Sequence, residues 1–299
     1  MKNKIQTHKG LVFFWVLATC ILINAPAQSV PDPVDIRPRE IRDWVGDATL
    51  EIRDRNKRGR QLLNECFDAH GWVAGNSSTI SATYIDDWSV APEPLRRYNN
   101  WPYLKQALQH DFLSFKLGHS RAQLLNGPSK GEIWGIDHAM PYKIINGEMN
   151  RVEDSNMVPA LVGKEYFIQL PYWTKKVPLV AYVKDTVHQG QPYHLVFGTW
   201  ETPKVNPRFD QYVYWINQKT KLLEIVQYTV RVVDPSAVGF VVFDDFREVD
   251  GVSIPFVHRL GYLPTSEGLI HEMRFQSVVL DPKGLSLHLL GNLREKEQP

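Results

Sequence analysis

The chain has 299 residues, of which 43% are hydrophobic and 22% are charged, and its formal net charge is +1. These fractions are typical of a folded protein and exclude wholesale disorder, a collagen repeat and a coiled coil. Because 34 basic residues are balanced by 33 acidic residues, the chain lacks the excess positive charge that DNA or RNA binding requires. We therefore expect no nucleic-acid partner.

The first 27 residues have the organisation of a secretory signal. Three lysines among the first nine residues precede an uncharged, mostly apolar run of 13 residues from Leu11 to Ile23, and Ala25-Pro26-Ala27 supplies small residues for cleavage. The apolar run is shorter than the roughly 20 residues that span a bilayer. We predict a signal peptide over residues 1–27, export to the periplasm or beyond the inner membrane, and no permanent membrane span in the mature chain.

The chain has two cysteines, too few for a disulfide framework. Cys20 lies within the expected leader, at a position that superficially resembles a lipid-attachment site. We favour a cleaved signal over lipid anchoring at Cys20, because Thr19 precedes the cysteine and the apolar run continues beyond it. Cys66 would then be the single thiol of the mature protein.

After the leader, the pattern predicts an extended arm followed by one domain. Residues 28–38 contain three prolines and are expected to be extended, and residues 39–299 are expected to form a single β-rich domain. Apolar residues recur every three or four positions over residues 38–69, which predicts a helix ending at His70-Gly71. The basic run within it, residues 53–60, is predicted to be a solvated helix face. A short helix is expected over residues 102–109, and a longer one over residues 155–170 that ends before Pro171.

The other elements are predicted strands separated by turn residues. Strand patterns cover residues 79–88, 112–118, 121–125, 133–136 and 142–145, and then 179–187, 193–201, 211–217, 221–233, 239–249, 253–262, 268–279 and 285–290. Asn146-Gly147 and Asp250-Gly251 predict tight turns. Such short connections make consecutive strands antiparallel neighbours, which excludes a dinucleotide-binding fold, and no G-x-G-x-x-G motif occurs.

Two of these segments indicate which way the sheet faces. Apolar and polar residues alternate in both, with the apolar sets being Leu269, His271, Met273 and Phe275, and Val226, Tyr228, Val230 and Val232. One apolar and one polar face predict a sheet that is covered on one side only. We therefore expect a curved sheet wrapped over helices, with an apolar space between the two layers.

The sequence offers no motif for catalysis or metal binding. His188 and His194 bracket a turn without a third ligand at close spacing, and neither H-E-x-x-H nor G-x-S-x-G occurs. The neighbouring carboxylates Asp86-Asp87 and Asp244-Asp245 lie on strands, where adjacent residues point to opposite faces. We accordingly expect a non-enzymatic protein with no metal and no cofactor.

Four segments carry a resemblance to a known family. The segments are 212–226 (YVYWINQKTKLLEIV), 243–255 (FDDFREVDGVSIP), 63–71 (LNECFDAHG) and 131–137 (GEIWGID). Their order resembles the periplasmic lipoprotein-carrier (LolA/LolB-like) superfamily, or a related bacterial family of unknown function, over most of residues 55–280. The resemblance implies an α+β, mainly antiparallel β fold: an open curved half-barrel sheet with helices covering its concave face. It also implies that the protein holds acyl chains or another apolar ligand in the periplasm.

We therefore predict a carrier for a lipid or another hydrophobic small molecule, held between the curved sheet and lid helices. The residues expected to face the ligand are Trp173 on the lid, with Phe197, Tyr228, Val230, Met273 and Phe275 on the sheet. Each of them could instead simply fill a core, because aromatic residues dominate protein cores in general. Two other classes stay open: a module that binds envelope proteins without a ligand, and a hydrolase acting on an envelope lipid or glycan.

Overall fold

The structure is a computed structural model that describes residues 49–72, 79–91, 105–114, 119–137, 140–152, 166–202, 206, 208–229, 231, 238–265 and 268–282. The expected leader (1–27), the expected arm (28–38) and the expected strand at 285–290 lie outside these ranges. So do the first part of the helix predicted from residue 38 and most of the helix predicted from residue 155.

The described residues form strands and a few helical segments. The helical segments are α2 (Thr49–Ala69), residues 166–173, and the short 3₁₀ helix η1 (Thr174–Lys176). The strands are β1 (Thr79–Asp87), β2 (Ala107–Ser114), β3 (His119–Leu124), β4 (Ile133–Asp137), β5 (Met140–Ile145), β6 (Glu148–Arg151), β7 (Leu179–His188), β8 (Gln191–Thr199), β9 (Gln211–Asn217), β10 (Leu223–Thr229), β11 (Val238–Val249), β12 (Val252–Gly261) and β13 (Leu269–Leu280). Within the described ranges, no helix combines the length and the hydropathy needed to cross a membrane.

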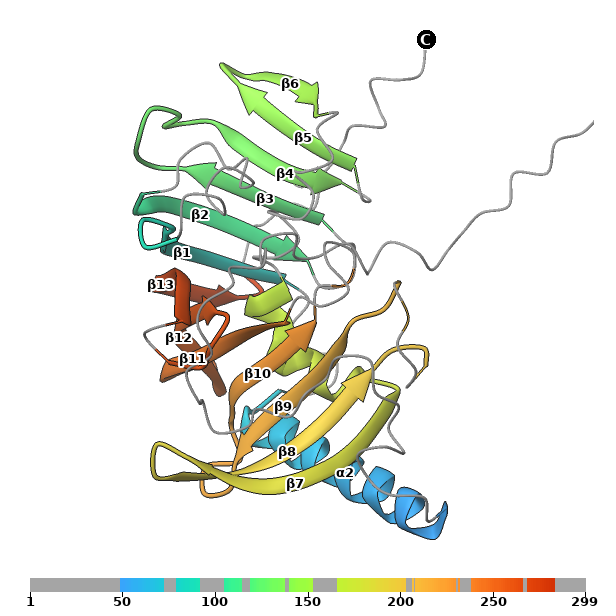
Figure 1. Cartoon of the computed structure of the whole chain (residues 1–299). Coiled ribbons are helices and arrows are strands. Elements are labelled where there is room, and N and C mark those ends of the chain that lie inside the picture. The colour runs from blue at the N-terminus through green and yellow to red at the C-terminus, as the bar shows by residue number, and fades with distance from the viewer. Residues whose placement is uncertain are drawn as a thin grey trace, which may run out of the picture.

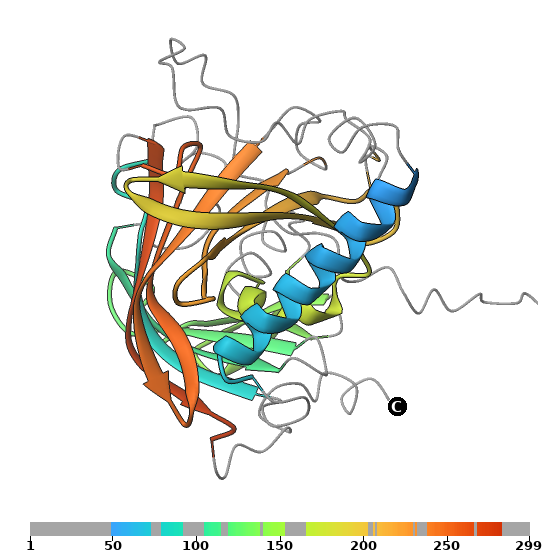
Figure 2. The same cartoon turned by 90° about the horizontal axis from the view of Figure 1, so that it is seen from below.

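All thirteen strands belong to one antiparallel sheet with the order β6-β5-β4-β3-β2-β1-β13-β12-β11-β10-β9-β8-β7. Neighbouring strands are consecutive in the chain everywhere except at the centre, where β1 pairs with β13 and so joins two meanders (Figure 1). Figure 2 shows the sheet curving around residues 166–173, with α2 lying across the open side. The predicted α+β fold, an open curved sheet with helices on its concave side, is confirmed.

Two local predictions were wrong, and one strand was not predicted. Residues 107–109 lie in β2, not in a short helix, because Ala107 and Gln109 pair with β1. The helix predicted to end before Pro171 continues to residue 173, since proline removes only one amide donor and the Trp173 Nε1–H donates to Gln169 Oε1 at 3.0 Å across that turn. Strand β6 was not predicted, because its four residues are all exposed and leave no apolar pattern to detect.

The main core lies between the concave face of the sheet and the helical segments. Leu62, Leu63 and Cys66 of α2 are fully buried there, together with Phe167 and Leu170 of the helical residues 166–173. The sheet contributes Tyr84, Leu113, Val196, Tyr214, Val226, Tyr228, Val241, Phe243, Phe256, Leu260, Met273 and Phe275 to the same cluster. We call this surface of the sheet the concave face. Its alternation in β10 and β13 is the one predicted from the sequence.

The opposite, outer face is apolar in part, which corrects the expectation of a sheet covered on one side only. A second buried cluster there consists of Tyr193, Leu195, Val213, Trp215, Ile225 and Phe240 on β8 to β11. The polar residues of β10 on this face, Gln227 and Thr229, are also buried. They were predicted to be solvated because they are polar. The structure instead satisfies Thr229 inside the protein, where its Oγ1–H donates to Asp210 Oδ1 at 2.9 Å.

The end of α2 is tied to two strands through His70. The His70 Nδ1–H donates to the Ser253 carbonyl oxygen at 2.8 Å, and the Leu223 amide donates to His70 Nε2 at 3.1 Å. The Ser253 amide also donates to the His70 carbonyl oxygen at 2.8 Å. Gly71 follows with φ +77, and a Cβ atom there would lie 2.0 Å from the Gly251 carbonyl oxygen, so only glycine fits this passage. The helix was predicted to end at His70-Gly71, and α2 ends at Ala69, directly before them.

The predicted basic run on α2 turns out to be partly structural. Arg55 Nη1 donates to the Val183 carbonyl oxygen at 2.9 Å, and the Arg60 guanidinium donates to the carbonyl oxygens of Lys175 and Pro178, each at 3.2 Å. Gly59 lies directly against β7. Arg53 and Lys57 are exposed, as the prediction of a solvated face requires. The run therefore holds α2 against β7 and η1 on one side and faces solvent on the other.

We expect stability to depend on pH through His70. Burial lowers the pKa of His70 from 6.5 to about 4, so the unfolded chain takes up a proton more readily than the folded chain. The stability that depends on a neutral His70 is fully present above about pH 6.5 and is lost as the pH falls towards 4, by about 3 kcal/mol in all. Urea unfolding at pH 7.5 and pH 5 should show about 2 kcal/mol of this loss in the wild type and a smaller loss in His70→Gln. An equal loss in His70→Gln would contradict the assignment, and His188→Gln is the control.

We also expect Gly59→Ala to weaken the seat of α2. The added methyl group would lie 2.8 Å from the Tyr182 backbone nitrogen and 2.9 Å from the Ala181 carbonyl carbon, and neither backbone atom can swing aside. Overpacking of this kind costs about 1–3 kcal/mol, which thermal denaturation would detect. Lys57→Ala, an exposed change on the same helix, should leave the midpoint nearly unchanged. Equal midpoints for both variants would show that α2 is not held at Gly59.

Candidate functional site

Three of the predicted ligand-facing residues lie together on the concave face. Tyr228, Met273 and Phe275 are all buried in the main core cluster. The Tyr228 ring lies 5.5 Å from the Phe167 ring, centroid to centroid, and the Phe275 ring lies 4.9 Å from the Tyr84 ring. The structure thus gathers these three side chains under the helical segments, on strands β10 and β13.

Trp173 lies at the margin of this cluster, at the end of the helical residues 166–173. Its half-buried ring packs against the core and lies 6.3 Å from the Trp200 ring. The ammonium group of Lys176 lies 4.5 Å from its ring centroid, within the range of a cation–π contact. Trp173 is therefore placed at the rim, between the core and solvent.

Two of the predicted residues are not part of this group. Phe197 was expected to face inward, but it lies on the outer face, because its neighbours Val196 and Gly198 on β8 are the residues that point to the concave side. Its partner across the sheet, Val213, belongs to the outer cluster. Val230 lies outside the described residues.

Polar side chains interrupt the apolar concave face at its centre. His271 Nε2 and Asp86 Oδ1 are 2.5 Å apart, and both side chains are almost completely buried. Gln109 Nε2 donates to the other oxygen of Asp86, Oδ2, at 3.1 Å. The Trp88 ring stacks on His271 with 4.2 Å between centroids. These residues come from β1, β2 and β13, three adjacent strands, so the sheet order alone brings them together.

A second buried carboxylate lies on the same face. Asp111 on β2 is 3% exposed, and its Oδ2 accepts a hydrogen bond from the Tyr84 hydroxyl. Together with Asp86, it places two acidic side chains beneath the apolar cluster. In this low-dielectric setting each one needs the donors that surround it.

His258 completes this polar group from β12. Its ring lies 4.9 Å from the rings of both Phe243 and Phe275, and burial lowers its pKa to about 3, so it is neutral. Nε2 lies 3.2 Å from the Pro255 carbonyl oxygen, which can only accept, so Nε2 carries the hydrogen. Nδ1 is then an acceptor, and it is buried without a hydrogen-bond partner among the described residues.

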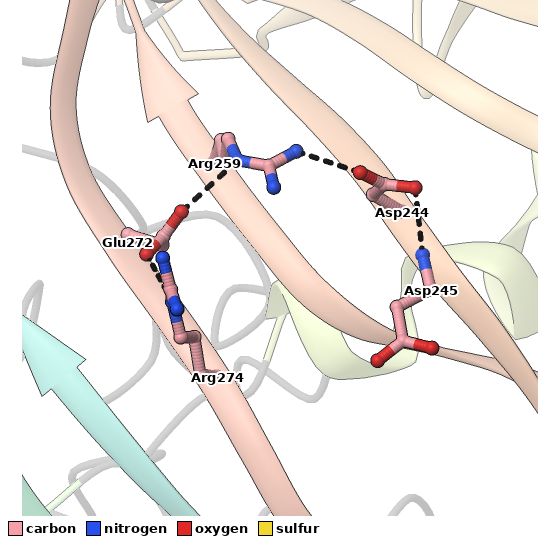
Figure 3. A network of polar contacts seen from close by, with 5 residues as sticks. All are labelled: Asp244, Asp245, Arg259, Glu272 and Arg274. Atoms are coloured by element: carbon pink, nitrogen blue, oxygen red, sulfur yellow. Dashed lines mark hydrogen bonds and ion pairs between the residues drawn. The ribbon is translucent and has the colours of Figure 1, made fainter.

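The outer face of the same strands is polar and solvated. Arg259 on β12 donates to Asp244 Oδ2 at 2.9 Å and to Glu272 Oε2 at 3.0 Å, so it bridges β11 and β13 (Figure 3). Arg247 and Arg274 pair with neighbouring carboxylates of their own strands. The pairs of Arg259 and Arg274 lie on the side of the sheet away from the concave core, where water screens them. The Arg247 guanidinium instead lies 4.3 Å from the ring centroid of Phe256, a residue of the concave face.

The geometry does not assemble hydrolytic chemistry at the buried histidines. In the described part of the chain, no serine, threonine or cysteine side chain lies within hydrogen-bond distance of the His271 ring. On the outer face, Ser81 Oγ lies 3.1 Å from His110 Nε2, but the Thr83 hydroxyl, rather than a carboxylate, contacts His110 Nδ1 at 2.6 Å. A serine nucleophile normally depends on a base that a carboxylate orients. Burial also raises the pKa of the Cys66 thiol, which disfavours the thiolate.

Other clusters do not form metal sites. Across the described ranges, no three His, Cys, Asp or Glu side chains converge closely enough to hold a metal ion. His188 lies by the Trp215 ring, while His194 Nδ1 contacts Asp185 Oδ1 at 2.6 Å at the surface.

Sequence reasoning missed the polar group of the concave face. The alternation of residues 268–276 did place His271 on the apolar side, and this was the one signal available. Asp86 lies 185 positions away and was judged only against its neighbour Asp87. His258 would have been found by extending the alternation argument to β12, where Ile254, Phe256 and Leu260 share its face.

The protein thus belongs to the class of folds in which helices cover the concave face of an open, curved antiparallel sheet. No protein-family model and no curated protein matches the chain. Among solved structures, the chain is similar to a DUF1329 family protein from Desulfovibrio piger, with 12% identity, a TM-score of 0.53 and coverage of 80% of this chain and 98% of that one. A LolA superfamily protein from Nitrosomonas europaea also matches, with 11% identity, a TM-score of 0.48 and coverage of 78% and 97%. The match to the Desulfovibrio piger structure confirms the fold that the resemblance implied.

We expect the buried His271–Asp86 pair to be strongly coupled. Removing one partner, as in Asp86→Ala or His271→Ala, leaves the other polar group buried without compensation and should cost about 3–5 kcal/mol. The double variant should cost clearly less than the sum of the two single variants. Urea unfolding of all four proteins measures this coupling.

The solvated Asp244–Arg259 pair, on the outer face of the same sheet, is the matched control for that cycle. Its coupling should be much smaller, because solvent screens it. Additive single-variant costs at Asp86 and His271 would show that the two side chains act independently.

Proposed function

We propose that the protein is an exported, non-enzymatic carrier that holds a hydrophobic ligand, a lipid or an acyl chain, between the concave face and the helical segments. The carrier domain would begin near residue 39, after a cleaved leader at 1–27 and the extended arm at 28–38. The ligand-facing residues would be Tyr228, Met273 and Phe275, with Trp173 at the rim.

One observation carries the proposal. Strands from both meanders turn apolar side chains towards one curved face, and helical segments from two distant parts of the chain lie over it (Figure 2). A sheet can bury a hydrophobic core without being curved in this way. A curved sheet with a helical cover can surround an apolar ligand chain and contact it on several sides. The shared fold of the Desulfovibrio piger protein supports the architecture and is silent on the ligand.

The energetics favour a long, unbranched ligand. Each buried CH₂ group contributes about 0.8 kcal/mol, so an acyl chain of ordinary length offsets the cost of association. The alternative role, a module that binds an envelope protein without a ligand, would leave the concave face without exchangeable lipid.

Native mass spectrometry distinguishes these roles. The full chain, expressed with its own N-terminal segment and purified from the periplasm without detergent, should carry a stoichiometric lipid-sized mass that organic extraction removes. An apo mass that takes up neither phospholipid nor fatty acid would refute the carrier role, and co-purifying protein in its place would support the interaction module.

The site itself is tested with Phe275→Asp. A carboxylate on the concave face should abolish ligand retention, since burying an unpaired charge beside an apolar chain is costly. Gln276→Asp is the matched control, because residue 276 is the next position on β13 and is exposed. Circular dichroism establishes that both variants fold. Unchanged retention in folded Phe275→Asp would remove Phe275 from the site.

A further inference from the structure

The polar group at the centre of the concave face contains several buried acceptors, and also one buried donor, the Trp88 Nε1–H, that has no hydrogen-bond partner among the described residues. Asp86 and Asp111 are acceptors whose oxygens face His271, Gln109 and Tyr84. His258 adds a further acceptor, since its Nε2–H is committed to the Pro255 carbonyl oxygen and its Nδ1 atom is buried without a hydrogen-bond partner among the described residues. The centre of the concave face therefore presents buried acceptors.

The Nδ1 atom of His258 is a buried acceptor with no hydrogen-bond donor among the described residues. The residue is 1% exposed, and aromatic rings at 4.9 Å flank it on both sides. A buried polar atom that makes no hydrogen bond destabilises a protein, and native structures keep few of them. A group that donates a hydrogen bond to Nδ1 would remove this penalty. Such a donor can come from water, from a ligand or from another segment of the chain.

Charge restricts the group that can approach. Two acidic side chains, Asp86 and Asp111, lie on the same face as His258, and water is largely excluded from all three. An ionised carboxylate or phosphate head group would bring a negative charge into a region of low dielectric constant that already holds two acidic side chains, and an ionised oxygen could not donate to Nδ1. A hydroxyl group is neutral and donates readily.

We propose that His258 Nδ1 is the acceptor for the head group of the bound ligand, and that this ligand is a neutral hydroxyl-bearing lipid, such as a long-chain alcohol, rather than an anionic one. The inference rests on the proposed carrier function and names the ligand class of that same site. The chain of the ligand lies against Phe243 and Phe275, and its hydroxyl group donates to Nδ1.

Three ligands of one chain length test this assignment: dodecan-1-ol, its methyl ether and dodecanoate, titrated into the full-length protein at pH 8 by calorimetry. The ether keeps the oxygen and loses the donor, and dodecanoate is ionised. The alcohol should bind about tenfold more tightly than the ether, the ratio expected for one net hydrogen bond, and more tightly still than dodecanoate.

Variants assign the preference to His258. His258→Phe keeps an aromatic ring without an acceptor and should bind alcohol and ether equally. His258→Asn restores an acceptor close to the position of Nδ1 and should recover part of the preference. His188→Phe, at the β7–β8 turn, should behave like the wild type.

The outcomes separate this inference from the carrier role. Equal binding of alcohol and ether by the wild type overturns the inference while leaving the carrier role intact, and so does tighter binding of dodecanoate. Failure of all three ligands to bind overturns both. If His258→Phe does not fold, the wild-type comparison and His258→Asn still decide.

Discussion

One buried imidazole fixes the end of α2 over the sheet. His70 donates from one ring nitrogen to β12 and accepts at the other from β10, so a single side chain fixes the end of α2 against two strands of the sheet. The Ser253 amide adds a backbone hydrogen bond to the His70 carbonyl oxygen, so the end of α2 and β12 are joined twice. Because Nε2 can accept a hydrogen bond only in the neutral ring, protonation of His70 would break the bond from β10, while the Nδ1–H bond to β12 would persist.

Much of the fold follows from local signals in the sequence. Asn146 and Gly147 adopt φ values of +52 and +81, the backbone expected of a tight hairpin turn, and β10 and β13 alternate as predicted. The pairing of β1 with β13 has no local signal, because the two strands are far apart in the chain. Strand β6 was missed for the opposite reason: its pairing with β5 is local, but its exposed residues show no pattern.

The candidate site shows the same division. Tyr228, Met273 and Phe275 could be assigned because each lies in a strand whose polar and apolar residues alternate. Phe197 could not, since β8 is buried at five successive positions from Leu195 to Thr199 and its composition does not distinguish the two faces. The pairing of β8 with β9 determines which face of the sheet Phe197 occupies. The contacts of Asp86 and His258 depend on sheet order, which no spacing of residues along the chain encodes.

The central β1–β13 seam has a consequence for the order in which the protein is made. The strand β1 emerges first from the ribosome, and β13, its partner on one side, emerges last among the described strands. Until then β1 presents one open hydrogen-bonding edge, although β2 already occupies the other. The two meanders can each form as they are synthesised, but their union waits for almost the whole polypeptide, a slow long-range step that leaves time for chaperones to hold the nascent chain.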